Sequence, residues 1–261
     1  MRPVYALLDR RFTDWLPIYC FAIEHPEGLI VVDTGIPANA NDPVWFPPWM
    51  RLVQRAALFQ MTPEQEIGPQ LKIHGLAAGD VRWVVLTHIH QDHDGGLKYF
   101  RNAELIVSRA EWQAASGLKG RVAGYLNQRW PDWLAPRLVD FDGGPRGEFP
   151  RSWQLTAGGD VHLVPTPGHS AGHLAVLVDE GRQTVCFSGD ASYTQQLLID
   201  DQIDGVGPDP DAQRRTHETI LRFAAGTPTV YVPSHERDGE RRLAEREPIP
   251  VGATHREGGE P

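Results

Sequence analysis

The chain has 261 residues, which is enough for one large α/β domain or two small ones. Its content of 41% hydrophobic and 23% charged residues is ordinary for a globular protein. The formal net charge of −9 argues against a nucleic-acid partner, because binding to a phosphate backbone favours a basic face.

Neither the start of the chain nor any later segment predicts export or membrane insertion. Residues 1–14 contain no apolar run bounded by a cleavage site, and no stretch reaches the roughly 18 apolar residues that span a bilayer. Cys20 and Cys186 each lie in an apolar, strand-like run, so we expect buried thiols rather than a disulfide. These features favour a cytoplasmic enzyme without a membrane partner.

Two apolar runs near the start of the chain predict a pair of strands. They cover residues 18–23 and 29–33 and are joined by the turn residues 25–28. Asp33 closes the second strand, where a carboxylate either caps the strand end or holds a metal-binding side chain in place. The residues alone leave these two roles equally open.

Residues 37–60 interrupt regular structure and concentrate aromatic side chains beside prolines. A loop of this length is usually functional or disordered, and disorder does not suit so many aromatics. One interpretation is core packing or a homodimer contact, and the other is an apolar wall over a ligand pocket. On the second interpretation the candidate substrate-binding residues are Trp45, Phe46, Trp49 and Met50.

The stretch 87–96 places three histidines and a carboxylate within six residues, directly after an apolar run. A strand that ends in such a cluster delivers metal ligands to a loop at a sheet edge. Because side chains alternate along an extended chain, His88 and His90 lie on one side and can bind one metal. Asp92 and His93 follow as the chain turns, and can face a second metal.

The other elements are expected from apolar patterns and cap residues. In the first half they are a helix from Thr62 to about His74, a short helix from Leu97, a strand over 104–107, a helix over 109–116, and loops with short helices over 120–150. In the second half they are strands over 161–164, 174–178, 184–188 and 229–232, a helix over about 211–225, and a frayed charged tail. Two strand-rich halves that each carry helices favour a four-layer αββα sandwich of the α/β class.

Three later candidate ligands follow apolar strands of the second half. They are His169, Asp190 and His235. A lone His169 would be a satisfied loop histidine, and a lone Asp190 would be a turn former. Imidazole or carboxylate groups at four separate strand ends instead indicate a metal site along one sheet edge.

With these motifs the chain resembles a metallo-β-lactamase-superfamily hydrolase from Asp33 to His235. It is most similar to the quorum-quenching N-acyl homoserine lactone lactonases. The matching segments are Asp33-Thr34-Gly35, Thr166-Pro167-Gly168-His169-Ser170-Ala171-Gly172-His173 and Asp190-Ala191-Ser192-Tyr193-Thr194. The resemblance implies a single metallo-β-lactamase domain over 1–261. The residues themselves add an apolar loop insertion at 37–60 and a charged tail that frays from about 240. The resemblance also moves Asp33 towards the role of holding a ligand.

The resemblance further implies how the ligands divide between two divalent ions. His88, His90 and His169 would bind one ion, Asp92, His93 and His235 the other, and Asp190 would bridge them. Zinc is the first expectation, and cobalt, manganese or iron also accept such ligands. A hydroxide between the ions would attack the lactone carbonyl, towards which Tyr193 would point, and Asp92 would protonate the leaving alkoxide.

Other functions share these ligands and are weighed beside the lactonase. A thioesterase of the glyoxalase II type, an aryl ester or phosphoester hydrolase and an iron-dependent persulfide dioxygenase are the alternatives. A β-lactamase is disfavoured by the bridging Asp190, and a nuclease by the acidic balance of the chain. A zinc-storage protein is disfavoured because structural zinc sites are usually closed by cysteines.

Overall fold

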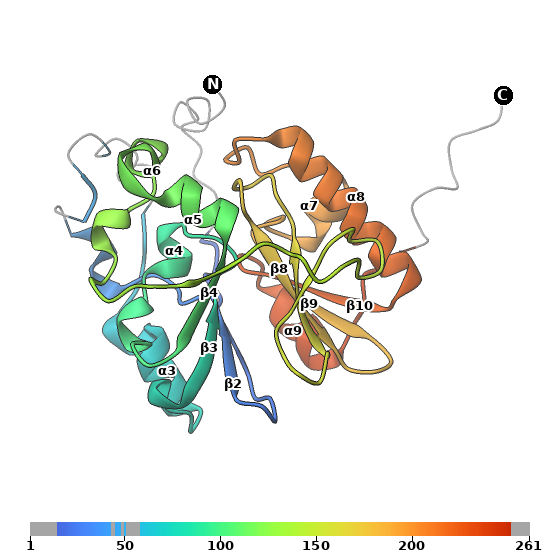
Figure 1. Ribbon diagram of the computed structural model, residues 1–261, viewed down its shortest axis with the longest axis horizontal. Coiled ribbons are helices and arrows are strands. Elements are labelled where there is room, and N and C mark those ends of the chain that lie inside the picture. Colours follow the sequence, from blue (N-terminus) through green and yellow to red (C-terminus); the bar gives the residue numbers. More distant parts are fainter. Residues whose placement is uncertain (1–14, 43–44, 48–49, 51–57, 252–261) are drawn as a thin grey trace. The chain divides into compact units, whose positions relative to one another are not determined.

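The computed structural model describes residues 15–42, 45–47, 50 and 58–251 (Figure 1). Contacts between residues divide the chain into two compact units. Unit 1 contains residues up to Asp140 together with Ser170–His173, and unit 2 contains Phe141–His169 and the chain from Leu174 onward. Within the described residues each unit has one five-stranded sheet.

The sheet of unit 1 has the strand order β1-β2-β3-β4-β5. Its strands are β1 (Phe21–Ile23), β2 (Leu29–Val32), β3 (Val81–Val85), β4 (Glu104–Ser108) and β5 (Arg137–Val139). β1 pairs antiparallel with β2, and the later pairs are parallel. Most residues of the central strands β2, β3 and β4 are buried, which explains why valine, leucine and isoleucine are frequent in them. Because β2 and β3 are parallel, Asp33 and Thr87 leave the sheet at the same edge.

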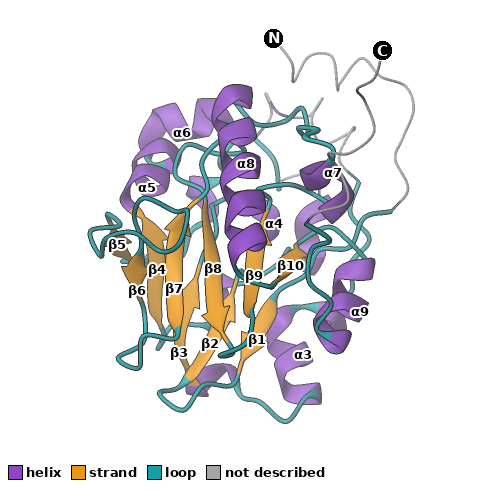
Figure 2. Ribbon diagram, turned by 90° about the vertical axis from the view of Figure 1, so that its right-hand side faces the viewer, coloured by secondary structure: helices purple, strands orange, loops and turns teal. Residues whose placement is uncertain are grey.

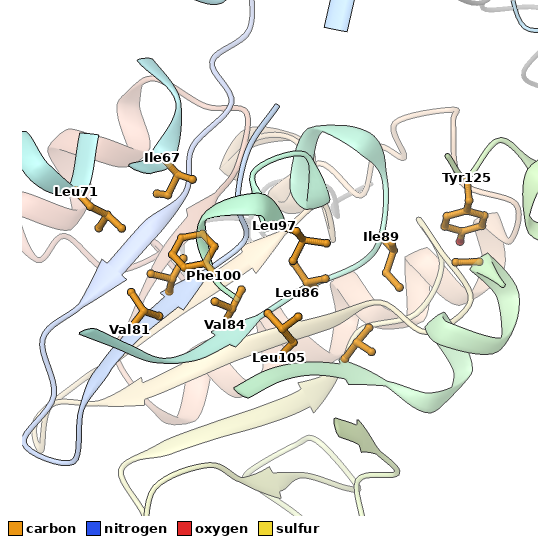
Figure 3. Close-up of a cluster of buried hydrophobic side chains, with 13 residues drawn as sticks. Ile67, Leu71, Val81, Val84, Leu86, Ile89, Leu97, Phe100, Leu105 and Tyr125 are labelled. Atoms are coloured by element: carbon orange, nitrogen blue, oxygen red, sulfur yellow. The ribbon is translucent and has the colours of Figure 1, made fainter. Parts of the chain in front are cut away.

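Within the described residues of unit 1 the α-helices are α3 (Ile67–Ile73), α4 (Gln91–Asp94), α5 (Arg109–Ala115) and α6 (Gly117–Ala123). Figure 3 shows the buried cluster between this sheet and its helices, where Leu71 of α3 and Val84 of β3 lie in the same core as Phe100. Ile89 also belongs to this core, so the loop between the first two candidate histidines is anchored by an apolar side chain.

The sheet of unit 2 has the strand order β10-β9-β8-β7-β6. Its strands are β6 (Trp153–Gln154), β7 (Val161–Pro165), β8 (Leu174–Asp179), β9 (Thr184–Gly189) and β10 (Thr229–Pro233). β9 and β10 are parallel, whereas the other neighbours are antiparallel. Both candidate ligands that follow β9 and β10 therefore leave this sheet at one edge, just beyond Gly189 and Pro233.

The helices of unit 2 are α7 (Gln195–Ile199), α8 (Pro210–Gly226) and α9 (Asp238–Glu245), drawn in purple in Figure 2. Asp209 caps α8, since its side chain accepts a hydrogen bond from the Ala212 amide at 2.9 Å. Ile220 and Phe223 of α8 pack into the core of this unit beside Tyr231 of β10. No helix of the described part of the chain is long and apolar enough to cross a membrane.

The largest differences from the sequence prediction lie where the chain is charged or short of apolar residues. Part of the tail predicted to fray from about 240 is helical, since α9 covers Asp238–Glu245, and the end of that tail, residues 252–261, lies outside the described residues. Arg242 is 3% exposed and pairs with Glu236 and Asp238, so ionic contacts rather than an apolar stripe hold this helix. β5 was not predicted, because its three residues are too few to show the alternation of apolar and polar side chains that marks a strand.

Candidate metal centre

The ligand cluster of unit 1 follows β3. The chain leaves the sheet after Val85 and turns into α4, whose first residue is Gln91. His88 and His93 are fully buried, whereas His90 is partly exposed. Nε2 of His88 lies 2.9 Å from Nδ1 of His90, and the rings of His88 and His93 have centroids 4.0 Å apart. The four residues predicted from the motif are thus near neighbours in this unit.

The hydrogen bonds of Thr87 set the tautomer of His88. The Thr87 hydroxyl donates to Oδ2 of Asp33 at 2.8 Å, so it accepts from Nδ1 of His88 at 3.1 Å. With its proton on Nδ1, a neutral His88 presents an unprotonated Nε2 on the side of His90. An unprotonated imidazole nitrogen is the form that binds a metal.

Asp33 connects β2 to this cluster. It is fully buried and accepts hydrogen bonds from the Thr87 amide, the Thr87 hydroxyl and Nδ1 of His93, each at 2.8 Å. Its backbone φ of 59° lies in the left-handed region, which residues other than glycine occupy only where the surroundings impose it. Asp33 therefore contacts His93 at Nδ1 and leaves Nε2 as the atom to face a metal.

The two carboxylates of α4, those of Asp92 and Asp94, have different surroundings. Oδ2 of Asp92 lies 3.8 Å from Nε2 of His93, and the Asp92 side chain is 23% exposed. Asp94 is buried and accepts a hydrogen bond from the indole nitrogen of Trp130 at 2.8 Å. Burial raises the pKa of Asp94 to about 7, although the bond from Trp130 acts in the opposite direction. Only Asp92 is placed beside a candidate ligand nitrogen with access to solvent.

The ligand cluster of unit 2 is built around Asp190, which follows β9 and is 2% exposed. Its Oδ2 lies 3.5 Å from Nε2 of His169 and 3.2 Å from Nε2 of His235. Gly168, just before His169, has a φ of 139°, and a Cβ there would come 2.4 Å from the amide nitrogen of Gln213. Only glycine fits this turn, which directs His169 towards Asp190.

His169 is held by a carboxylate that was not predicted from the sequence. Nδ1 of His169 donates to Oδ2 of Asp204 at 2.8 Å. Burial alone would raise the pKa of Asp204, but the bonds from His169, the Val206 amide and Gln213 lower it to about 2. The ionised Asp204 leaves Nε2 of His169 as the nitrogen nearest Asp190.

Tyr193 also lies in this cluster. The centroid of its ring is 4.9 Å from the ring of His235, in an edge-to-face arrangement, and 5.8 Å from the ring of His169. Tyr193 immediately precedes Thr194, whose side chain caps α7 by accepting from the Leu197 amide. The tyrosine predicted from the motif is therefore beside two of the predicted ligand histidines.

The aromatic segment is described in part. The indole nitrogen of Trp45 donates to the side-chain oxygen of Gln91, which directly follows His90, at 3.0 Å. Arg129 donates to the carbonyl oxygen of Trp45 through Nε at 3.0 Å and Nη2 at 2.6 Å, and its guanidinium lies 4.8 Å from the indole centroid. Phe46 is buried and Met50 is partly buried, whereas Trp49 lies outside the described residues.

The donor atoms of these two clusters suit divalent transition metals. They are imidazole nitrogens and carboxylate oxygens, and the described cysteines, Cys20 and Cys186, are not among them. In each candidate histidine whose Nδ1 has a fixed partner, Nε2 is the ring nitrogen that would bind a metal; these residues are His88, His93 and His169. The residues present therefore fit metal ions, and seven donors exceed what one tetrahedral ion uses.

Comparison with known proteins agrees with a metal-dependent hydrolase. Residues 13–235 match the metallo-beta-lactamase superfamily. The chain is 32% identical over 198 residues to the N-acyl homoserine lactonase AiiA of Bacillus thuringiensis subsp. kurstaki, covering 75% of this chain and 72% of that protein. A solved N-acyl homoserine lactone hydrolase, with N-hexanoyl-L-homoserine at its catalytic metal centre, has a TM-score of 0.68 and 27% identity, covering 87% and 84% of the two chains.

A third similarity concerns the fold alone. AidC, a dizinc quorum-quenching lactonase solved with N-hexanoyl-L-homoserine, has a TM-score of 0.59 and 19% identity, covering 84% of this chain and 72% of its own. The fold and the site define a metal-dependent hydrolase. The chain belongs to the metallo-beta-lactamase superfamily, and the predicted fold class and enzyme class are confirmed.

Proposed function

We propose that this enzyme hydrolyses the ester bond of lactone rings, with N-acyl homoserine lactones as its substrate class. The observation that carries the proposal is the position of Tyr193 beside both His169 and His235. A hydrolase that uses metal ligands alone does not need a phenol there. The similarity to AiiA and to a hydrolase solved with its acyl-homoserine product supports the same substrate class.

The proposed centre joins the two clusters in one metallo-β-lactamase domain. His88, His90 and His169 would hold one divalent ion, Asp92, His93 and His235 would hold the other, and Asp190 would be shared between them. Zinc is the proposed metal, because the ligands are nitrogen and oxygen donors that suit it. When bound, the two ions supply the Lewis acid that activates water and polarises the ester carbonyl.

The residues of the chain supply the remaining chemistry. Tyr193 donates a hydrogen bond to the carbonyl oxygen as that oxygen becomes negative, after water has added to the carbonyl carbon. The bond between this carbon and the ring oxygen then breaks. Asp92, whose side chain is 23% exposed, takes the proton that the attacking water releases and gives it to the departing alkoxide. The product is the open-chain N-acyl homoserine.

The acyl tail is proposed to lie against the aromatic segment formed by Trp45, Phe46, Trp49 and Met50. Trp45 supports this placement, since its indole is fixed by Gln91 directly beside the ligand His90. Arg129 covers the indole and holds the backbone of the same residue. The competing prediction for this segment is a contact between two copies of the chain. The cytoplasmic location of the enzyme also remains a prediction.

Substrate choice is tested by following acid release in a pH-stat with one purified zinc-loaded preparation. The panel contains N-hexanoyl homoserine lactone, γ-butyrolactone, a glutathione thioester and an aryl phosphoester. We expect the acyl homoserine lactone to give the highest kcat/KM. Higher values for the thioester would replace the proposal with the glyoxalase II type. Oxygen consumption by a separate iron-loaded preparation on a persulfide would indicate the dioxygenase.

Metal content is tested separately by elemental analysis. Wild-type protein should hold two zinc ions per chain, and Asp190→Ala should lose metal and turnover together, because Asp190 is proposed to contact both ions. Arg109→Ala is a suitable control, since Arg109 is exposed and its ion pair within the described residues is with the exposed Asp140. A wild-type protein that holds one ion in excess zinc would contradict the binuclear centre.

A further inference from the structure

Glu111 is a fully buried carboxylate in the first turn of α5. Its Oε1 accepts from the Ile89 amide and the Tyr125 hydroxyl, each at 3.1 Å. Its Oε2 accepts from the Ser170 hydroxyl at 2.7 Å and from the Gly172 amide at 3.0 Å. All these residues belong to unit 1. Each carboxylate oxygen is therefore bonded to two donors, from segments far apart in the sequence.

The donors to Glu111 are backbone or neutral groups rather than cations. Across the described residues, no lysine or arginine forms an ion pair with Glu111. A buried carboxylate is costly unless it is well hydrogen-bonded, so all four donors are needed to keep it in place. The same bonds fix the donors, which makes Glu111 a rigid junction between their segments.

Two of the joined segments are attached to proposed metal ligands. Ile89 lies between His88 and His90, so its amide is part of the loop that carries both imidazoles. Ser170 follows His169 directly along the chain. Glu111 thus holds the backbone of the first stretch through the Ile89 amide, and the segment after His169 through Ser170 and Gly172. None of these hydrogen bonds comes from the side chain of a proposed ligand.

The segment after His169 is fixed at the start of α5 by further contacts. The hydroxyl of Ser108, which caps α5 by accepting from the Glu111 amide, donates to the Gly172 carbonyl oxygen. A Cβ at Gly172 would lie 2.0 Å from the amide nitrogen of Glu111. The backbone of Gly172 therefore lies directly on the first turn of α5, closer than any other residue type permits.

Tyr125 extends the junction to a ligand ring. Its hydroxyl donates to Glu111, and its ring centroid lies 5.3 Å from that of His90. Tyr125 is 7% exposed and belongs to the same buried cluster as Ile89 (Figure 3). Glu111 therefore sets the orientation of the Tyr125 ring, which in turn packs against the ring of His90.

We propose that Glu111 is a positioning residue for the metal centre, which sets the backbone of the His88–His90 loop and of the segment that follows His169. The inference rests on the proposed metal centre, but not on the identity of the substrate. Losing a partner that orients ligands typically costs about 10- to 100-fold in metal affinity.

The test is zinc affinity, measured on the full-length protein by competition with a chromogenic chelator. Glu111→Gln keeps the size of the side chain but turns one acceptor into a donor, which faces two of the existing donors. We expect zinc binding about 10- to 100-fold weaker than in wild type. Gln113→Ala, at an exposed position of the same helix, should leave zinc affinity unchanged.

Two further measurements separate a positioning role from a general loss of stability: the spectrum of the protein loaded with cobalt in place of zinc, and variants that each remove one hydrogen-bond donor to Glu111. The visible spectrum of the cobalt-loaded Glu111→Gln protein should differ from wild type, which a general loss of stability would not produce. If that variant does not fold, Ser170→Ala and Tyr125→Phe each remove one donor and should weaken zinc binding in the same direction. Wild-type zinc affinity and cobalt spectrum in the folded variants would overturn the inference. A wild-type enzyme that binds zinc but does not hydrolyse lactones would overturn only the proposed function.

Discussion

Asp33 and His93 are 60 positions apart in the sequence, yet Oδ2 of Asp33 accepts a hydrogen bond from Nδ1 of His93 at 2.8 Å. The same carboxylate accepts two bonds from Thr87, the residue just before the ligand loop. Asp33 has a left-handed backbone conformation, which is unfavourable for a residue with a side chain, and in this conformation its carboxylate contacts both Thr87 and His93. One carboxylate therefore fixes the orientation of a proposed ligand and the start of its loop together.

Asp33→Asn should consequently weaken metal binding. The amide can satisfy only some of the three donors that the carboxylate accepts, so His93 loses the partner that fixes its tautomer. We expect a decrease of about 10- to 100-fold in zinc affinity. Chelator competition provides the measurement. Asp42→Asn, at an exposed position of unit 1, is the control and should bind zinc like wild type.

Glu66 predicts a dependence of stability on pH away from the ligands. Its buried carboxylate accepts from the Ala38 amide at 2.8 Å and the Tyr99 hydroxyl at 2.6 Å, and pairs with Lys98. Burial alone would raise the pKa of Glu66, but Lys98, Tyr99 and the Ala38 amide together lower it below 4.5. Tyr99 remains protonated as a donor, because burial and Glu66 raise its pKa to about 12.

Since the folded pKa of Glu66 is lowered, its ionisation stabilises the fold above pH 4.5, and this contribution is lost as the pH falls through the folded pKa. Glu66→Gln should reduce the free energy of unfolding by about 1–3 kcal/mol at pH 7. The difference from wild type should shrink below pH 4.5 in urea titrations of metal-free protein. A constant difference between pH 7 and pH 3 would show that ionisation of Glu66 is not its source.

Much of this architecture could be predicted from the sequence, because it depends on local patterns. The apolar runs at 29–33, 104–107 and 184–188 match β2, β4 and β9 to within one residue at each end. The candidate ligands were also predicted from local patterns, because each of them follows the end of an apolar strand run.

The partners of those ligands could not be predicted in the same way. Asp204 and Glu111 act on residues 35 and 59 positions away, and neither belongs to a local motif. The predicted helix from Thr62 was interrupted for a related reason, because Glu66 takes an extended conformation, in which its side chain accepts the bonds from Ala38 and Tyr99. Long-range polar contacts decide these features, and a single sequence does not record them.

The aromatic segment predicts a preference for long acyl chains. Each methylene buried against Trp45 should contribute about 0.8 kcal/mol, or about fourfold in kcat/KM. Trp45→Ala should flatten the rise in kcat/KM from N-butanoyl to N-decanoyl homoserine lactone, and Arg129→Gln should do so in part, because Arg129 holds Trp45. Activity on γ-butyrolactone, which has no acyl tail, is the internal control. A wild-type chain-length profile accompanied by loss of a dimer would identify the segment as a subunit contact.

Tyr193 separates a lactonase from a general metal hydrolase of this fold. Its ring lies edge-on to His235, and the proposed role requires the hydroxyl to donate to the lactone carbonyl oxygen as negative charge develops. Loss of one such donor typically costs about 10²–10³ in kcat. The metal ions share this stabilisation, so we expect Tyr193→Phe to lower kcat on a homoserine lactone by roughly tenfold or somewhat more.

The same variant should retain two metal ions per chain, because the phenol is not a proposed ligand and phenylalanine keeps the ring contacts with His169 and His235. An activated aryl ester has a better leaving group and asks less of oxyanion stabilisation, so its kcat should fall by a smaller factor. Tyr231→Phe is the matched control, since Tyr231 is buried in the core of unit 2 and its hydroxyl is hydrogen-bonded to Ser192. Unchanged lactone turnover in Tyr193→Phe would reduce this tyrosine to packing and remove the main support for a lactonase.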